Sequence, residues 1–303
     1  MNTEAIIVDW GTTAFKAWLV ELSSGEILAS TSNTMGMSRL DSVQFSQALD
    51  QSIGCWKETQ PELPVYMAGM VGAAGGWCLA PQLPTPLSLH DLSKNLMQVP
   101  NQKNTWIIPG ARVPGNNPDI MRGEEVQIFG GLKLSGKEQA LMCLPGTHSK
   151  WAQIKDHQLV NFVTSMTGEV HQVMLKHSVL GKSLVLDQQT ASSEAFEAGL
   201  AEANGETNVL HIMFTARTRL LAGSLDEHQV SDYLSGILIG AEVRSMAKRF
   251  PPESQPLVLI SGIALKTPYT KALERVGYRI EWIDAGTASC EGIREIINIT
   301  RSS

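Results

Sequence analysis

Residues 5–13 read Ala-Ile-Ile-Val-Asp-Trp-Gly-Thr-Thr, an apolar run that leads directly into an acidic residue and a glycine turn. A short apolar run that is bounded by a turn predicts a buried strand, here over residues 5–8. A second strand is expected over 14–22, and a polar turn at 23–26 leads to a third over 27–31. The start of the chain therefore predicts a strand, a glycine turn, a second strand and a short hairpin.

The second half of the chain begins with the same order of elements. Strands are expected over 139–144, 150–154 and 159–164, with a glycine turn after the first and a tight turn after the second. The dipeptides Gly11-Thr12 and Gly146-Thr147 occupy equivalent places and lie 135 residues apart. Such a repeat predicts two domains of similar topology whose equivalent turns face each other. We place these domains at 1–134 and 135–303.

Helical spacing of apolar residues, glycine and proline define the remaining elements. Residues 80–118 are rich in Pro, Asn and Gly and are expected to form ordered loops around one strand, 105–108. The other expected elements are a helix over 43–58, a strand over 65–70, a helix from about 122, helices over 167–178, 190–203, 208–222 and 227–249, a strand over 257–261, a helix over 266–276, a strand over 278–283 and a final helix from about 287.

The composition is that of a soluble globular protein, and the cysteine pattern favours a reducing compartment. The 303 residues carry 24 Lys and Arg against 30 Asp and Glu, without a basic run, which argues against nucleic acid or an anionic membrane as partner. No apolar stretch reaches the roughly 18 residues of a membrane span, and the acidic start does not resemble a secretory signal. The four cysteines are isolated, which favours buried free thiols over disulfides or a zinc site. We therefore expect a cytoplasmic protein; whether it forms a homodimer is left open.

The first glycine turn has the chemistry of a phosphate site. Gly11 lets the backbone approach an anion closely, and successive N–H groups of a turn form an anion-binding nest. Thr12 and Thr13 add hydroxyl donors, and Lys16 adds a positive charge. Asp9, at the end of the strand, can hold Mg²⁺. The alternative is a plain hairpin turn that an aspartate side chain caps.

The second glycine turn offers similar groups. Gly146 provides the close backbone approach, Thr147 and Ser149 provide hydroxyls, and His148 and Lys150 are candidate cations. The alternative is an ordinary surface histidine beside a solvated strand lysine. Because two such turns lie in duplicated positions, the phosphate interpretation is favoured over two unrelated turns.

Arg122-Gly123-Glu124-Glu125 stands between the two turns. In the functional interpretation, Glu124 or Glu125 is a general base for the hydroxyl that attacks a γ-phosphate, and Arg122 binds an anionic group of the substrate. The alternative is structural, because carboxylates in the first turn of a helix are stabilised by its dipole. The residues alone do not decide between these interpretations.

Two further segments are candidates for ligand contacts. Ser261-Gly262-Ile263 follows a predicted buried strand, and its small residues would let adenine and ribose lie against the backbone. The segment 69–77 is rich in Gly and Ala and could line a sugar pocket, with Trp77 as one wall. The alternatives are a plain strand-to-helix loop and a close-packed turn.

The order of these motifs resembles the actin-like ATPase superfamily, which includes sugar kinases, chaperone ATPases and exopolyphosphatases. The resemblance implies duplicated ribonuclease-H-like domains with an interdomain cleft for ATP and Mg²⁺. More narrowly, the chain resembles the 2-dehydro-3-deoxygalactonokinase family along essentially its whole length. The matching stretches are 9–13, Met121-Arg122-Gly123-Glu124-Glu125 with Gln127 and Gly130, Leu144-Pro145-Gly146-Thr147-His148-Ser149-Lys150-Trp151, and 162–169.

This resemblance implies transfer of the γ-phosphate of ATP to the terminal (6-) hydroxyl of 2-dehydro-3-deoxygalactonate in galactonate catabolism. It favours Glu125 as the base, by analogy with exopolyphosphatase-type relatives, and Arg122, then Arg39 or Arg112, as ligands of the substrate carboxylate. The segments 70–77 and 80–82 depart from the family pattern in residues expected to face the sugar. The alternatives are a phosphohydrolase of the exopolyphosphatase type and a non-catalytic ATP-binding regulator.

Overall fold

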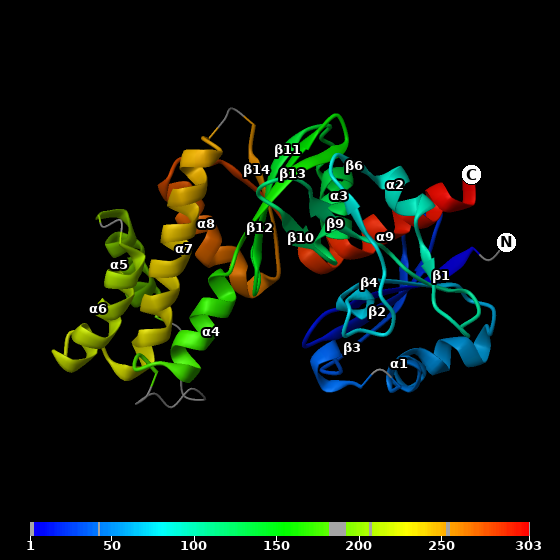
Figure 1. The fold of residues 1–303 in the computed structure, drawn as a ribbon, viewed down its shortest axis with the longest axis horizontal. Helices are drawn as coiled ribbons and strands as arrows, with labels where there is room; N and C mark the ends of the chain where they lie inside the picture. Colours follow the sequence, from blue (N-terminus) through cyan, green and yellow to red (C-terminus); the bar gives the residue numbers. More distant parts are fainter. Residues whose placement is uncertain (1–2, 42, 182–191, 206–207, 253–254, 303) are drawn as a thin grey trace. The chain divides into compact units, whose positions relative to one another are not determined.

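The computed structural model describes residues 3–41, 43–181, 192–205, 208–252 and 255–302 (Figure 1). The first sheet is built around β1, which pairs with β2 in antiparallel and with β4 in parallel orientation. Its strand order is β3-β2-β1-β4-β8-β7. The bounds of these strands are β1 Glu4–Trp10, β2 Phe15–Glu21, β3 Ile27–Asn33, β4 Val65–Gly69, β7 Met97–Gln98 and β8 Thr105–Ile107.

A second six-stranded sheet repeats this topology in the later part of the chain. Its order is β15-β14-β11-β12-β13-β6, and β11 and β14 are parallel. The run β15-β14-β11-β12-β13 matches β8-β4-β1-β2-β3 strand for strand, so the predicted duplication is confirmed at the level of topology. The bounds are β6 Leu87–Ser88, β11 Ala140–Leu144, β12 Ser149–Lys155, β13 Gln158–Ser165, β14 Leu257–Ser261 and β15 Ile280–Asp284.

The chain divides into two compact units, which we describe separately. Unit 1 comprises residues 1–140, 152–162 and 283–303, and unit 2 comprises 141–151 and 163–282. The predicted boundary between residues 134 and 135 separates the two halves of the duplicated sequence. It is not a boundary between these compact units, and it stays a prediction.

Strand β1 of unit 1 is buried on both faces. Its successive side chains point to opposite faces of the sheet. Ile6, Val8 and Trp10 belong to a core cluster that also contains residues of helix α1. Asp9 lies on the opposite face, which α9 covers. The helices of unit 1 are α1 Phe45–Thr59, α2 Leu89–Lys94, α3 Glu124–Ser135 and α9 Ala285–Ser302.

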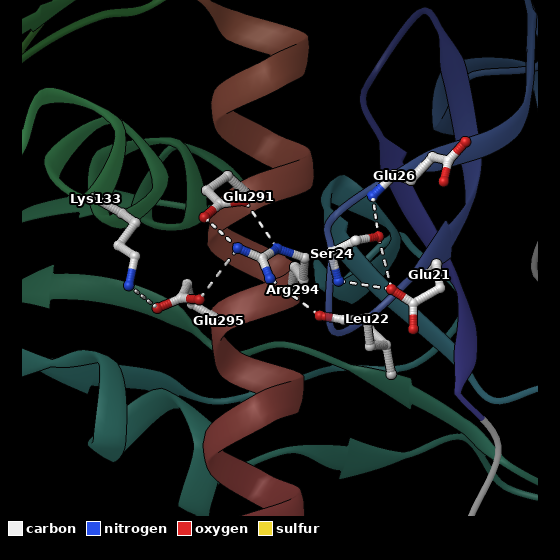
Figure 2. Close-up of polar contacts among 8 residues, drawn as sticks. All are labelled: Glu21, Leu22, Ser24, Glu26, Lys133, Glu291, Arg294 and Glu295. Carbon is white, nitrogen blue, oxygen red and sulfur yellow. Dashed lines mark hydrogen bonds and ion pairs between the residues drawn. The ribbon is translucent and has the colours of Figure 1, made fainter.

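Helix α9 is fixed to its neighbours in unit 1 by Arg294 (Figure 2). The guanidinium donates to the Leu22 carbonyl at 3.0 Å and to both carboxylate oxygens of Glu291 at 2.6 and 2.9 Å. Glu295 lies 3.5 Å from Arg294 and pairs with Lys133 of α3 at 3.0 Å. Because the Arg294 side chain is mostly shielded from water, this network holds α9 against both α3 and the turn after β2.

Helices α3 and α9 cross with almost no space between their backbones. A Cβ atom at Gly292 would lie 1.9 Å from the Val126 carbonyl oxygen, and one at Gly130 would lie 1.9 Å from the Ala288 oxygen. No side chain fits there without moving a helix.

Gly292→Ala is therefore expected to lower the free energy of unfolding by about 3 kcal/mol, because overpacking here displaces backbone rather than a flexible side chain. Denaturant unfolding measures the effect. Gly54→Ala is the matched control: Gly54 lies inside α1 with open space around its Cα, so alanine is expected to stabilise by about 0.5–1 kcal/mol. An unchanged stability of Gly292→Ala would contradict the close crossing.

Unit 2 places helices around strands β11 and β14. Its helix pair α5 and α7 is close-packed through Gly199 and Gly236, whose Cβ atoms would lie 2.1 and 2.2 Å from opposing carbonyl oxygens. Its core includes Trp151, Leu259 and Tyr269. The helices are α4 Thr167–His177, α5 Ser193–Gly205, α6 Val209–Leu221, α7 Val230–Arg249 and α8 Ile263–Arg275.

Most predicted elements are present, with two main differences. The expectation of loops around one strand over 80–118 is wrong: α2 lies there, as do β6, β7, β5 (Gln82–Pro84) and β9 (Gly110–Val113). β5 and β9 form a three-stranded sheet with β10 (Asp119–Met121), which follows this segment. Such short strands carry no measurable periodicity, although the capping box of Ser88 and Asp91 marks the start of α2. Helix α8 begins at Ile263 rather than near 266. The predicted helix start at 190–191 lies outside the described residues.

The four cysteines are free, and Cys143 and Cys290 are buried as predicted. The expected burial is wrong for Cys55, which is exposed on α1, and for Cys78, which is half-buried. Across the described ranges, none of the helices has the length and apolar character that a membrane crossing requires.

Candidate active site

The backbone of the first glycine turn contacts residues 36–38, a later segment of unit 1. The Gly11 N–H donates to the Ala14 carbonyl at 2.9 Å and closes the turn. The Ser38 N–H and hydroxyl both donate to the Thr12 carbonyl, at 2.9 and 2.8 Å. A Cβ at Gly36 would lie 2.3 Å from the Thr13 carbonyl carbon, so only glycine allows this support. The side chains of Thr12 and Thr13 are exposed, as an anion site requires.

Asp9 lies at the end of β1 beside that turn. It pairs in register with Lys16, and the Ser289 hydroxyl of α9 donates to Asp9 Oδ2 at 3.0 Å. The pKa of the Asp9 carboxyl is raised above its ordinary value, chiefly by burial and also by the charge of Glu124. The hydrogen bond from Ser289 and the charge of Lys16 oppose this shift. Asp9, Lys16, Ser289 and Glu124 thus form one polar group in unit 1.

Two glycines let helix α3 begin close to the ends of β1 and β4. Gly69 has φ +98°, and a Cβ there would lie 2.7 Å from the Trp10 carbonyl oxygen. Gly123 has φ +104°, and its Cβ would lie 3.0 Å from the Gly69 Cα. Because both positions need glycine for conformation and for space, Glu124 and Glu125 are carried to the strand ends.

The two glutamates have different environments. Glu125 is fully buried, and both of its oxygens accept from the Gly123 N–H, at 2.9 and 2.8 Å. Glu124 is half-buried and accepts from the Arg122 N–H at 3.1 Å. Burial, with the charge of Glu124, raises the pKa of Glu125 to about 8. Glu125 is therefore largely protonated at neutral pH and shielded from solutes, whereas Glu124 has an accessible edge.

The predicted substrate-binding residues have different surroundings. Arg122 Nη2 donates to the Ala80 carbonyl at 2.7 Å, and its Nη1 is buried against Gly72 with no hydrogen-bond partner among the described residues. Arg39 is exposed and donates to Thr34. Trp77 is half-buried and stacks on Phe45 at 6.2 Å between ring centroids, so it serves the core of unit 1 on at least one face. Arg112 donates to the Gln82 carbonyl at 3.3 Å.

The second glycine turn is joined to the start of α4 in unit 2. The Glu169 N–H donates to the Thr147 carbonyl at 2.9 Å. A Cβ at Gly168 would lie 2.4 Å from the Gly146 carbonyl oxygen, so the turn and the helix touch through their backbones. The amino-terminal end of α4, with the positive end of the helix dipole, therefore lies against the turn.

A pocket of about 350 Å³ opens at this junction. Its polar end contains the turn and the first residues of α4, and its apolar walls come from α7 and α8. The lining residues are Gly146, Thr147, Thr167, Gly168, His171, Gln172, Ser235, Leu238, Ile239, Leu265 and Tyr269. A pocket with one polar and one apolar end suits a ligand that carries a phosphate on a flat apolar group.

The other predicted residues of this half lie around the pocket rather than in it. His148 is exposed, and its Nε2 lies 2.5 Å from Glu169 Oε2. Ser149 and Lys150 are buried in β12. Ser261 is buried at the end of β14, where its hydroxyl accepts from the Trp282 indole at 3.1 Å, while Gly262 and Ile263 are exposed at the start of α8.

Sequence reasoning missed several residues of these sites. Ser289 lies 280 positions after Asp9, and the only available signal was the small-residue run Ala285–Ser289 at the start of the last helix. Gly69 was noted only as part of a glycine-rich segment. Thr167, Ser235 and Tyr269 lie on three different helices, and no spacing rule connects them.

Comparison with known proteins identifies the family of this chain. The chain matches the family described as 2-keto-3-deoxy-galactonokinase over residues 9–296. It is 36% identical over 297 residues to the 2-dehydro-3-deoxygalactonokinase of Escherichia coli strain K12, and the match covers 98% of each chain. A relative of the same family name from Rhizobium meliloti strain 1021 is 30% identical over 290 residues, which cover 94% of each chain.

Solved structures with a similar fold support the same family. A crystal structure from Sinorhizobium meliloti that carries the same family name superposes with a TM-score of 0.87 at 29% identity and covers 97% of this chain and 98% of that one. The activator of 2-hydroxyisocaproyl-CoA dehydratase from Clostridium difficile, solved with bound ADPNP, has a TM-score of 0.56 at 15% identity, with 99% and 96% covered. That likeness concerns the fold alone, and it confirms the predicted fold of duplicated ribonuclease-H-like domains. With nearly its whole length matched, the chain belongs to the 2-keto-3-deoxy-galactonokinase family.

Proposed function

We propose that this chain, an ATP-using sugar-acid kinase by its family, phosphorylates 2-dehydro-3-deoxygalactonate on its terminal (6-) hydroxyl as a step of galactonate catabolism. The observation that carries the proposal is the near-complete match to relatives named for this activity. The same match favours a kinase over the phosphohydrolase and over the non-catalytic regulator.

The nucleotide is assigned to the pocket of unit 2. Adenosine would lie against Leu238, Ile239 and Leu265, and the phosphates would meet Gly146 and Thr147 and the start of α4. Support comes from the volume, the separation of apolar and polar ends, and the backbone contact between turn and helix. The exposed Gly262 and Ile263 lie at the start of α8, whose Leu265 lines the pocket.

The reacting groups are assigned to unit 1. Glu124 is the general base: it removes the proton of the sugar hydroxyl while that oxygen bonds to the γ-phosphorus and the bond to the ADP oxygen breaks. Its half-exposed position beside Asp9 supports this assignment, and the burial of Glu125 supports a positioning role for the second glutamate. The sequence-based preference for Glu125 stays a prediction. Thr12, Thr13 and Lys16 are assigned to the phosphates.

The residues around Asp9 fit a magnesium ion. Mg²⁺ in phosphoryl-transfer enzymes keeps several waters and takes one or two protein carboxylates together with phosphate oxygens. The carboxylate of Asp9, at the end of β1 beside the exposed side chains of Thr12 and Thr13, would be one such ligand. When bound, the ion neutralises charge on the transferred phosphate.

Arg122 is the candidate for the substrate carboxylate. Its buried Nη1 has no partner among the described residues, and a guanidinium nitrogen in that state gains most from a carboxylate. Arg39 and Trp77 stay weaker candidates, because Arg39 is exposed and Trp77 packs into the core.

Filling the pocket tests the nucleotide assignment. Ser235→Trp should weaken ATP binding at least tenfold by calorimetry, because the indole would occupy the space assigned to adenosine. The KM for the sugar acid should change less than twofold. Unchanged ATP affinity in the folded variant would contradict the assignment.

The substrate is tested by ADP release with 2-dehydro-3-deoxygalactonate, 2-dehydro-3-deoxygluconate, galactonate and plain hexoses. We expect turnover with the first compound to exceed the others at least a hundredfold in kcat/KM. Preference for another acid would keep the kinase and reject the substrate. No turnover with any of them would reject the proposed function.

A further inference from the structure

Glu242 is a buried carboxylate that no part of the proposed mechanism uses. It lies on α7, is only 6% exposed, and is surrounded by the apolar core of unit 2. Its neighbours in the helix, Ile239 and Val243, belong to that core. A carboxylate in such a place is costly unless several donors satisfy its oxygens.

Three side chains donate to Glu242, and each comes from a different element. The Trp151 indole N–H of β12 donates to Oε1 at 2.8 Å. The Tyr269 hydroxyl of α8 donates to Oε2 at 2.8 Å, and the Thr167 hydroxyl of α4 donates to the same oxygen. Ser149, also in β12, shares a 2.8 Å hydrogen bond with the Tyr269 hydroxyl.

Two of these side chains line the nucleotide pocket, and the other two lie in the strand next to its glycine turn. Thr167 and Tyr269 line it directly, while Ser149 and Trp151 lie in the strand that follows the Gly146 turn. Glu242 is therefore bonded to the first residue of α4, to one wall of the pocket and to the strand behind the turn. Burial raises the pKa of Glu242, whereas the hydrogen bonds from these hydroxyls and the indole lower it.

We propose that Glu242 is a positioning residue for ATP: its carboxylate sets the spacing between the phosphate turn, the start of α4 and α8. The inference rests on the proposed nucleotide pocket. Glu242 lies in none of the sequence motifs described above. Charge-assisted hydrogen bonds to one shared oxygen fix the Thr167 and Tyr269 hydroxyls relative to each other more tightly than apolar packing does. A small displacement of either wall changes how phosphates and adenosine fit together.

The test uses Glu242→Gln in the full chain, because glutamine keeps the shape and one acceptor oxygen. We expect the KM and the Kd for ATP to rise about tenfold, with kcat lowered less than threefold and the KM of the sugar acid unchanged within twofold. Tyr269→Phe, which keeps the ring in the pocket and removes the hydroxyl, should raise the KM for ATP by several fold. The double variant should be no worse than Glu242→Gln alone, because both act through one hydrogen bond.

Tyr278→Phe is the matched control. It removes another buried hydrogen bond of the same core, from the Tyr278 hydroxyl to the Phe250 carbonyl, at residues that do not line the pocket. It should lower the melting temperature and leave the KM for ATP unchanged.

Two results would overturn the inference. One is a Glu242→Gln protein that loses stability as Tyr278→Phe does, with its KM for ATP unchanged. The other is an equal rise in the KM of both substrates. If Ser235→Trp weakens ATP binding and Glu242→Gln does not, only this inference fails; if Ser235→Trp has no effect, the pocket assignment fails and the inference with it.

Discussion

Asp9→Asn is expected to lower kcat with ATP by about a thousandfold while leaving the fold intact. The loss follows from removing the one carboxylate assigned to the magnesium ion, since metal and electrostatic stabilisation carry much of phosphoryl transfer. The fold should survive because asparagine still accepts from Ser289, and because burial already raises the pKa of Asp9 and so disfavours its charge. The measurement is kcat as a function of Mg²⁺ concentration, together with circular dichroism.

Ser289→Ala is the matched control for this variant. It removes the hydrogen bond to Asp9 Oδ2 but keeps the carboxylate, so kcat should fall about tenfold or less. Chelation of divalent cations should abolish turnover of the unchanged protein. Near-normal kinetics of a folded Asp9→Asn protein would contradict the metal role.

Glu124→Gln and Glu125→Gln are expected to separate the two adjacent carboxylates. A general base contributes about 10²–10⁴-fold, so Glu124→Gln should lose kcat by that range with little change in the KM for ATP. Glu125→Gln should lose less than tenfold, because Glu125 is enclosed and bonded to the Gly123 N–H. The reverse order would restore Glu125 as the base, and two equal, mild losses would favour a purely helix-capping role.

Stability against pH gives a second readout for Glu125. Its folded-state pKa of about 8 lies above the ordinary value of 4.5, so the folded state binds the proton more tightly than the unfolded chain. This contribution is complete below pH 4.5 and is lost as pH rises toward 8. Glutamine does not titrate, so Glu125→Gln should gain stability relative to the unchanged protein between pH 5 and 8.5. If the free energies of unfolding of the two proteins differed by the same amount at every pH, the pKa of Glu125 would not be raised and this prediction would be wrong.

The features that sequence predicted are those with a local cause. The apolar run before Asp9, the glycine turn and the following hairpin are local patterns, and their recurrence around Gly146 revealed the duplicated topology. The order of the motifs also indicated the family, which the comparisons confirm. Most strands between 80 and 118 were not predicted, because they are only two to four residues long. Such strands form through pairing with neighbouring strands, and their own sequences are too short to show a hydrophobic alternation.

The features that sequence missed depend on distant contacts. Nothing in the adjacent Glu124 and Glu125 indicates that only one is enclosed, since this follows from Gly69 and Gly123 bringing α3 against the strand ends. Ser289 reaches Asp9 only because α9 packs on β1. Glu242 reads as an ordinary helix glutamate, and its role becomes visible only when three elements converge on it.

The most direct test of the account is the stoichiometry of the reaction. ADP and phosphorylated sugar acid should be quantified in one reaction of the full chain with Mg²⁺-ATP and 2-dehydro-3-deoxygalactonate. The account predicts one phosphorylated sugar acid for each ADP, with the phosphate on the terminal hydroxyl and negligible ADP when the sugar acid is omitted. ADP formed together with free phosphate, whether or not the acid is present, would contradict the kinase mechanism.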